Sequence, residues 1–219
     1  MYAFIHPDAV NCSDDMRRIG YEVQVRPTPI NVTDIRGGLK DHVNGASCCG
    51  ATESLKLYSY LLSDHEIVVH LDMDVVVLQP LDDLFDSMLE GPDSPARRRL
   101  PAMWVDNVTE LPEQIDAFFT RDYNMLSSTK KREPKQTGVQ GGFIVVRPNE
   151  TIFQASLDTI LEGHYNPGHG WGGSKLRYGG YYGAAQVQGL WSFVYGHLYP
   201  GTSVELNRCI YNTMFGRPE

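Results

Sequence analysis

The fold of this chain is decided by the stretch Glu66-Ile-Val-Val-His-Leu-Asp-Met-Asp-Val-Val-Val-Leu-Gln-Pro-Leu-Asp-Asp-Leu-Phe-Asp86. An apolar run leads to Asp72 and Asp74, and a second apolar run leads away from them. In an extended chain side chains alternate between two faces, so these two carboxylates are expected on one side. Carboxylates suit a buried strand poorly, but they are good oxygen ligands for a hard divalent cation. We therefore expect a cation site at the end of this strand, and a structural turn is the alternative. His70 is expected to be a packed histidine rather than a third ligand.

Strands and helices alternate along the first part of the chain. The patterns predict a strand over residues 2–5, a helix over 14–19 and a second strand over 21–26. This order is typical of an α/β unit with a parallel sheet. Ligands of open α/β sheets bind at the carboxyl ends of strands, which is where Asp72 and Asp74 fall.

A helix is predicted directly before the strand that carries the aspartates. Thr52 can cap this helix, which is expected to run to Leu62. Its apolar face is expected to comprise Leu55, Tyr58, Leu61 and Leu62. Lys56 lies off that face, where a lysine is usually solvated.

The whole chain, residues 1–219, is expected to form one domain with a loop-rich insertion at about 91–136. The predicted fold class is α/β, with a Rossmann-type, mixed but mostly parallel sheet flanked by helices. Further helices are expected at 81–88, 112–119, 151–162 and 186–195, and further strands at 102–105, 143–146 and 204–206.

A glycine-rich and aromatic stretch runs from Gly163 to Gly189. It lacks the glycine spacing of a phosphate-binding or dinucleotide-binding loop. Glycines beside aromatic side chains suit the flat stacking surfaces of a sugar-binding cleft. The alternative is a structural loop.

The charge and hydropathy of the chain exclude several classes of protein. The net charge of -8 and the pI of about 5.3 argue against a nucleic-acid partner, which would require a basic surface. No segment approaches the ~20 apolar residues of a membrane span. The four cysteines lack the paired spacing of a zinc site.

Four asparagines lie in acceptor sequons for N-glycosylation: Asn11, Asn31, Asn107 and Asn149. This number exceeds what chance would supply in a chain of this length. We therefore expect the lumen of the secretory pathway, such as the Golgi, as the location of this protein, although the N-terminus has no signal-peptide pattern. A cytoplasmic location is the alternative if the sequons are unused.

Several motifs resemble the glycogenin-like family-eight glycosyltransferases. The first block comprises Leu55-Lys-Leu-Tyr-Ser-Tyr-Leu-Leu62 and the stretch Val68–Asp86, which resembles a lysine helix, Asp-x-Asp, a short apolar strand and an Asp-Asp-Leu-Phe turn. The stretch Val139–Pro148 resembles the family's Asn-Ser-Gly-Val strand. Val187-Gln-Gly-Leu190 resembles its Asp-Gln-Gly helix start, and Tyr211-Asn212 its closing Tyr-Asn.

The resemblance implies a GT-A fold and a retaining transfer of a hexose from a nucleotide-diphospho-sugar, UDP-linked in particular, to a glycan, protein or small-molecule acceptor. It implies Mn²⁺ or Mg²⁺ as cofactor, bound by Asp72 and Asp74. Lys56 would meet the negative charge of the donor, and Asp72 would also touch its ribose or sugar. The substrate-binding residues would further include Gln140 and Gly141, and Gln188 would be both a substrate-binding and a catalytic residue beside the transferred sugar.

The sequence also departs from the family pattern. Gln140 and Gly141 replace the family's asparagine and serine, and Val187 replaces the aspartate before Gln188. The family's first strand and its late His-x-x-Gly-x-x-Lys segment have no counterpart, which predicts a chain that is truncated at both ends.

Two other classes remain as alternatives. A catalytically silent sugar- or nucleotide-binding homologue would keep the fold without the reaction. A phosphatase of the haloacid dehalogenase type also carries an Asp-x-Asp motif after an apolar strand, with the first aspartate as nucleophile. That motif lies in the first strand and requires a later serine or threonine and a lysine, and no convincing set follows here.

Overall fold

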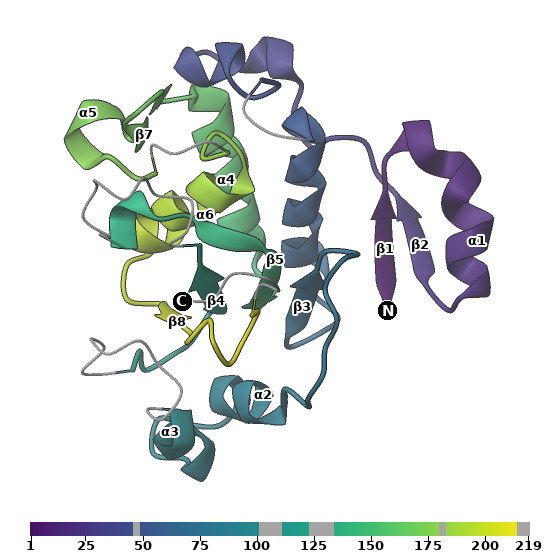
Figure 1. The fold of residues 1–219 in the computed structure, drawn as a ribbon, viewed down its shortest axis with the longest axis vertical. Helices are drawn as coiled ribbons and strands as arrows, with labels where there is room; N and C mark the ends of the chain where they lie inside the picture. The colour runs from purple at the N-terminus through teal and green to yellow at the C-terminus, as the bar shows by residue number, and fades with distance from the viewer. Residues whose placement is uncertain (46–48, 101–110, 123–133, 180–182, 214–219) are drawn as a thin grey trace.

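The computed structural model describes residues 1–45, 49–100, 111–122, 134–179 and 183–213. It shows a mixed α/β fold with a central sheet and helices around it (Figure 1). The sheet has the strand order β3 (Val68–Leu71), β5 (Val139–Val146), β4 (Ala117–Arg121) and β8 (Ser203–Glu205). The predicted α/β class is therefore confirmed.

The expectation of a mostly parallel sheet is wrong for the central sheet. Strand β5 is antiparallel to both of its neighbours, β3 and β4, and only β4 and β8 pair in parallel. Strands β1 (Tyr2–Ile5) and β2 (Glu22–Val25) form a separate parallel pair, as the first predicted unit requires. An apolar run predicts burial but not direction, because the long connections between strands allow either orientation.

Helical elements cover the sheet and link its strands. The α-helices are α1 (Ser13–Arg18), α2 (Asp82–Leu89), α3 (Pro95–Arg99), α4 (Glu150–Glu162), α5 (Gly173–Leu176) and α6 (Val187–Phe193). The 3-10 helices are η1 (Pro7–Cys12), η2 (Val32–Asp34), η3 (Gly38–Asp41), η4 (Gly50–Leu61) and η7 (Pro134–Gln136). A π-helical turn, η8 (Val194–Leu198), continues α6, and a tight hairpin joins β6 (Tyr165–Asn166) to β7 (Gly170–Trp171). Within these described ranges, no helix is both long and apolar enough to cross a membrane.

The central strand β5 divides the core into two apolar layers. Ile144 and Val146 pack into one cluster together with Leu57 and Trp191. Phe143 and Val145 pack into a second cluster with residues of α2 such as Leu84 and Met88. The alternation follows from the period of two along a strand, which sends successive side chains to opposite faces. Strand β5 is therefore covered on both faces, and it provides a rigid support for the polar residues near its start.

The helix predicted at residues 52–62 forms, but as the 3-10 helix η4, and its predicted apolar face is wrong. Its buried positions include Ser54, Leu57 and Tyr60, which are three residues apart, whereas Leu61 is exposed. A 3-10 helix has 3.0 residues per turn, so side chains at i and i+3 lie above one another. Thr52 is not the cap either, because Cys49 precedes the helix and the Thr52 hydroxyl donates to its carbonyl.

The second apolar run of the opening stretch is exposed rather than buried. Met73, Val76 and Leu78 are 91%, 75% and 88% exposed. The chain turns directly after β3, since the Val75 N–H donates to the Asp72 carbonyl at 3.0 Å. This turn takes the chain away from the sheet before the second run can pair, and it returns to the core only at α2.

Most other predicted elements are confirmed, and one is wrong. The predicted helix at 151–162 corresponds to α4, which Asn149 caps and Gly163 ends in the left-handed conformation. The helix expected over 112–119 is absent from the described residues 111–122, where Ala117–Arg121 form β4. Aromatic residues such as Phe118 favour a strand between two neighbours over a helix. The strand predicted at 102–105 lies outside the described residues.

Candidate functional site

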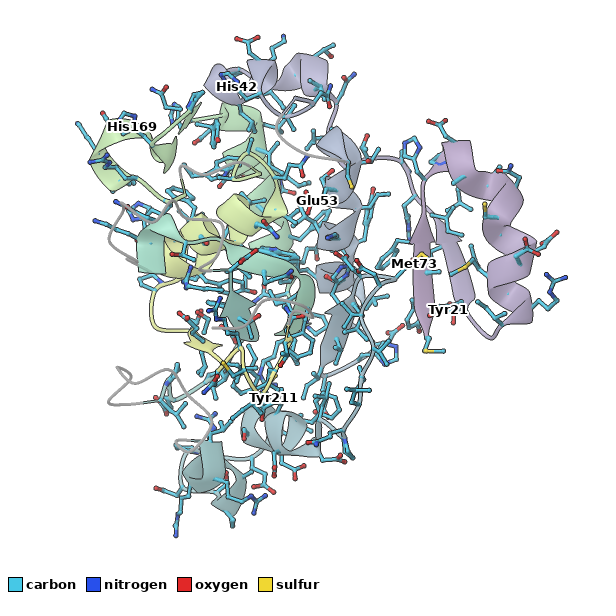
Figure 2. All side chains as sticks on the ribbon, in the orientation of Figure 1. Tyr21, His42, Glu53, Met73, His169 and Tyr211 are labelled. Carbon is cyan, nitrogen blue, oxygen red and sulfur yellow. The ribbon has the colours of Figure 1, made fainter. Side chains whose placement is uncertain are left out.

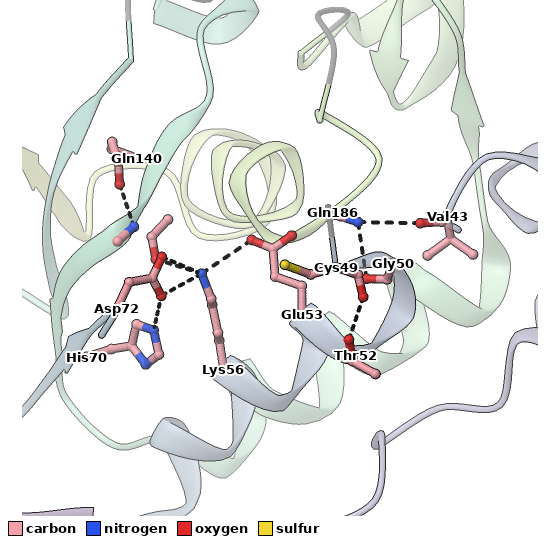
Figure 3. A network of polar contacts seen from close by, with 12 residues as sticks. Val43, Cys49, Gly50, Thr52, Glu53, Lys56, His70, Asp72, Gln140 and Gln186 are labelled. Carbon is pink, nitrogen blue, oxygen red and sulfur yellow. Dashed lines mark hydrogen bonds and ion pairs between the residues drawn. The ribbon is translucent and has the colours of Figure 1, made fainter. Parts of the chain in front are cut away.

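The ammonium group of Lys56 is the centre of a polar cluster at the end of β3 (Figure 3). Its Nζ atom lies 2.8 Å from Asp72 Oδ1 and donates to Asp72 Oδ2 at 3.0 Å. It also donates to the carbonyl oxygen of Gly141 at 3.1 Å. These contacts bring together η4, the residue after β3 and the start of β5. The lysine is therefore an ion-paired member of the cluster and not a solvated helical side chain.

Glu53 is also a member of this cluster, and the sequence did not predict it. Figure 2 labels Glu53 among all the side chains. Its Oε1 atom lies 3.4 Å from Lys56 Nζ, and its side chain is only 11% exposed. Glu53 and Lys56 share one side of η4 because residues three apart are aligned in a 3-10 helix. Burial raises the pKa of the Glu53 carboxyl, while the ammonium of Lys56 opposes that rise. The signal in the sequence was the Glu-x-x-Lys spacing, which is common and points to no site by itself.

His70 lies at the inner side of the cluster. Its Nε2 atom is 3.4 Å from Asp72 Oδ1, and its ring meets Trp191 edge-on at 6.3 Å between centroids. Burial lowers the pKa of His70 below its ordinary value, and the hydrogen bond with Asp72 only partly opposes this. The histidine is therefore neutral at pH 7 and contributes a hydrogen bond rather than a charge.

Asp72 is the most heavily contacted acidic residue of the cluster. Burial alone would raise the pKa of its carboxyl, but the hydrogen bonds with His70 and Lys56 together outweigh it and lower the pKa. Asp72 is therefore fully ionised at neutral pH, and its negative charge is held in place from two sides.

Strand β5 and helix α6 close the cluster. A Cβ atom at position 141 would lie 3.1 Å from Gln188 Cγ, and one at position 142 would lie 3.5 Å from Asp72 Oδ2. The two glycines therefore let polar side chains approach the backbone of β5. The Gln140 side chain turns back and accepts from the Gly142 N–H. The structure thus brings together five predicted site residues: Lys56, Asp72, Gln140, Gly141 and Gln188.

Asp74 does not join this cluster in the way that the sequence predicts. Met73 and Asp74 lie in the turn after β3, so the period of an extended strand does not apply to the pair. Asp74 is exposed, and within the described ranges its carboxylate makes no hydrogen bond or ion pair. The Asp-x-Asp motif therefore supplies one held carboxylate and one that faces solvent.

The donor chemistry of these residues fits a hard divalent cation only together with a bound substrate. In the described part of the chain, no three His, Cys, Asp or Glu residues are grouped so as to hold a metal ion. Mg²⁺-type ions are commonly bound by one or two carboxylates, with phosphate oxygens and waters completing the coordination. Asp72 could supply one such carboxylate and would share its charge between the ion and Lys56, whereas Asp74 would have to turn inward from solvent to supply a second.

Comparisons of the chain with known protein families, with curated proteins and with solved structures give no match.

Proposed function

We propose that this protein is a metal-dependent, retaining glycosyltransferase that moves a hexose from a nucleotide-diphospho-sugar, UDP-linked in particular, to an acceptor such as a glycan, a protein or a small molecule. One observation carries the proposal. Several segments that each resemble the family meet in a single polar cluster. In this cluster Lys56 contacts both Asp72 and the Gly141 carbonyl of β5, and the Gln188 side chain lies beside Gly141. A GT-A fold is part of this proposal.

The residues of the cluster have chemistry that suits a diphosphate donor. The ammonium of Lys56 offers positive charge to phosphate oxygens, and the ionised carboxylate of Asp72 keeps it in position. Gly141 and Gly142 let the side chains of Gln188 and Asp72 lie close to the backbone of β5, and Gln188 offers its amide group to sugar hydroxyls. A Mn²⁺ or Mg²⁺ ion held by Asp72 and Asp74 would act as a Lewis acid on the leaving diphosphate.

A thermal-shift panel of UDP- and GDP-sugars, with and without Mn²⁺, tests this proposal. We expect a metal-dependent rise of Tm for one donor, because a ligand that binds only the folded state stabilises it. The Asp72→Ala variant should lose this rise, whereas Asp64→Ala, at an exposed position outside the cluster, should keep it. A flat panel for the wild-type chain would overturn the proposal.

A catalytically silent binding protein is the second candidate, and Val187 favours it. The family's aspartate at this position is replaced by an apolar residue that is 2% exposed and packs in the core. The site therefore lacks one carboxylate next to Gln188. Release of UDP from the donor that gives the largest thermal shift distinguishes the two candidates, since a silent protein binds the donor but never turns it over.

We also infer that the protein works in the secretory-pathway lumen. Asn11 and Asn31 are exposed. The Oδ1 atom of Asn149 accepts from Thr151 N–H and Ile152 N–H, which leaves its amide nitrogen for a glycan. Expression in the secretory pathway of cultured cells, followed by digestion with an N-glycosidase, should reduce the apparent mass. An unchanged mass would favour the cytoplasm.

A further inference from the structure

Glu53 is the charged residue of the cluster that the proposed donor site leaves without a role. The Lys56 ammonium has three donor positions, and its closest contacts are to the two oxygens of Asp72 and the carbonyl of Gly141, at 2.8, 3.0 and 3.1 Å. Glu53 Oε1 lies farther away, at 3.4 Å. In the part of the chain that the structure describes, Glu53 has no other hydrogen-bond partner. Its carboxylate therefore retains acceptor capacity for a ligand.

The Glu53 carboxylate lies next to the start of β5. A Cβ atom at position 141 would lie 3.5 Å from Glu53 Oε1 and 3.1 Å from Gln188 Cγ. Because Gly141 has no side chain, the Glu53 carboxylate and the Gln188 side chain can both lie close to the backbone at this position. Figure 3 shows Glu53 and Asp72 on opposite sides of the Lys56 ammonium.

Lys56 thus divides the cluster into two parts of different chemistry. On one side, Asp72 can take up a cation and the diphosphate that the cation neutralises. On the other side, a second carboxylate would repel phosphate, but it accepts strong hydrogen bonds from neutral hydroxyl groups. Together with the amide of Gln188, it forms a set of polar groups that suits a sugar ring.

We propose that Glu53 accepts hydrogen bonds from hydroxyl groups of the transferred sugar and, with Gln188, sets the specificity for that sugar. The inference rests on the proposed function, since it assigns the sugar half of the same donor site. A site that hydrogen-bonds a hydroxyl rejects the epimer that lacks it there, because a buried polar group is then left unpaired.

The Glu53→Gln variant tests this proposal, because it keeps the size of the side chain and removes the charge. The probes are UDP, UDP-glucose and UDP-galactose, each titrated by calorimetry in the presence of Mn²⁺. We expect the affinity for UDP to stay within about twofold, since Lys56 and Asp72 remain paired. The affinity for the preferred UDP-hexose should fall about tenfold, as expected for the loss of a hydrogen bond to a charged group, and the preference between the two epimers should shrink.

Two further variants sharpen the result. Gly141→Ala places a methyl group against Glu53 and Gln188, and it should weaken UDP-hexose binding by a larger factor than UDP binding. Glu66→Gln, at an exposed carboxylate outside the cluster, should change neither affinity. If Glu53→Gln weakens UDP and UDP-hexose equally, or changes neither, this inference is overturned while the transferase proposal stands. If the wild-type chain binds no UDP and no UDP-sugar, both are overturned.

Discussion

The ammonium of Lys56 lies 2.8 Å from the Oδ1 atom of Asp72, across sixteen positions of the chain. This ion pair joins the 3-10 helix η4 to the end of the edge strand β3, and Glu53 approaches the same ammonium from the other side. The single ammonium of Lys56 therefore forms ion pairs with two carboxylates, those of Asp72 and Glu53. Because the side chains of Lys56 and Glu53 are only 17% and 11% exposed, solvent can replace the ammonium only in part.

Replacing Lys56 with methionine should destabilise the protein at neutral pH. The substitution leaves Glu53 and Asp72 without their shared cation, and an unsatisfied, partly buried polar group costs about 1–3 kcal/mol. Urea unfolding of Lys56→Met measures the loss, which should shrink as the pH falls and the carboxylates become protonated. Lys175→Met, at an exposed lysine of α5, should change the free energy of unfolding by less than about 0.5 kcal/mol. Equal effects of the two substitutions would contradict the role of the ion pair.

His70 should make stability depend on pH just below neutrality. Burial lowers its pKa in the folded state below the ordinary value of 6.5, so the unfolded chain binds more protons in this window. The contribution of neutral His70 to the free energy of unfolding is therefore fully present above pH 6.5, and it is lost as the pH falls through the lowered pKa. Denaturant unfolding between about pH 7.5 and 5 should show a smaller decline for His70→Gln than for the wild type. His164→Gln, at an exposed histidine, should follow the wild-type curve, and a variant of His70 that does so would refute this assignment.

The hydroxyl groups of Tyr60 and Tyr195 should couple strongly. They lie 2.8 Å apart, and both side chains are buried. Burial raises the pKa of both hydroxyls, so they remain protonated as a hydrogen-bonded pair. Each single change to phenylalanine should cost about 1–2 kcal/mol because it leaves the other hydroxyl unpaired, whereas the double change should cost less than the sum. A double-mutant cycle in urea measures this coupling, and strict additivity would argue against the pair.

Truncation of Leu57 and truncation of Leu78 should change the free energy of unfolding by very different amounts. Leu57 is fully buried in the core, and Leu57→Ala should cost about 2–5 kcal/mol through lost contacts and a residual cavity. Leu78 is 88% exposed, and Leu78→Ala should change stability by less than about 0.5 kcal/mol. Chemical denaturation of both variants makes the comparison. A large loss for Leu78→Ala would contradict the exposure of the apolar run after Asp74.

Gly189→Ala should disturb the helix that carries Gln188. A methyl group at position 189 would overlap the carbonyl oxygen of Ala184, and backbone cannot move aside as a flexible side chain can. We expect a loss of about 1–3 kcal/mol in urea unfolding, as for other overpacked positions. Gly91→Ala is the matched control, because nothing lies within 4 Å of the point that its methyl group would occupy. Similar stabilities of the two variants would contradict the close packing of α6.

Local sequence patterns correctly predicted the elements whose formation depends on signals within the same segment, such as an apolar period or a helix cap. Helix α4 follows from its apolar period, from the Asn149 cap and from Gly163 at its end. Strand β5 follows from an apolar run, and β1, α1 and β2 follow from a strand–helix–strand pattern. In contrast, the helix predicted over 112–119 was wrong because pairing with β5 and β8 outweighs local propensity.

The sequence also identified most residues of the candidate site, but not how they meet. Lys56, Asp72, Gln140, Gly141 and Gln188 were all singled out, and they lie together. Glu53 was missed because its role depends on a 3-10 helix, whose period of three the apolar pattern did not reveal. Asp74 was placed beside Asp72 on the assumption of an extended chain, and the turn after β3 removes that assumption.

The sequence by itself determined the composition of the site and the α/β character of the chain, because residue type and periodicity act over a few neighbouring positions. Only the tertiary structure decided the direction of β5, the exposure of the run after Asp74 and the partners of Lys56. These features depend on contacts between residues that lie far apart in the chain, such as Lys56 and Gly141, separated by 85 positions. Such contacts are selected by the packing of the whole domain and not by any local pattern.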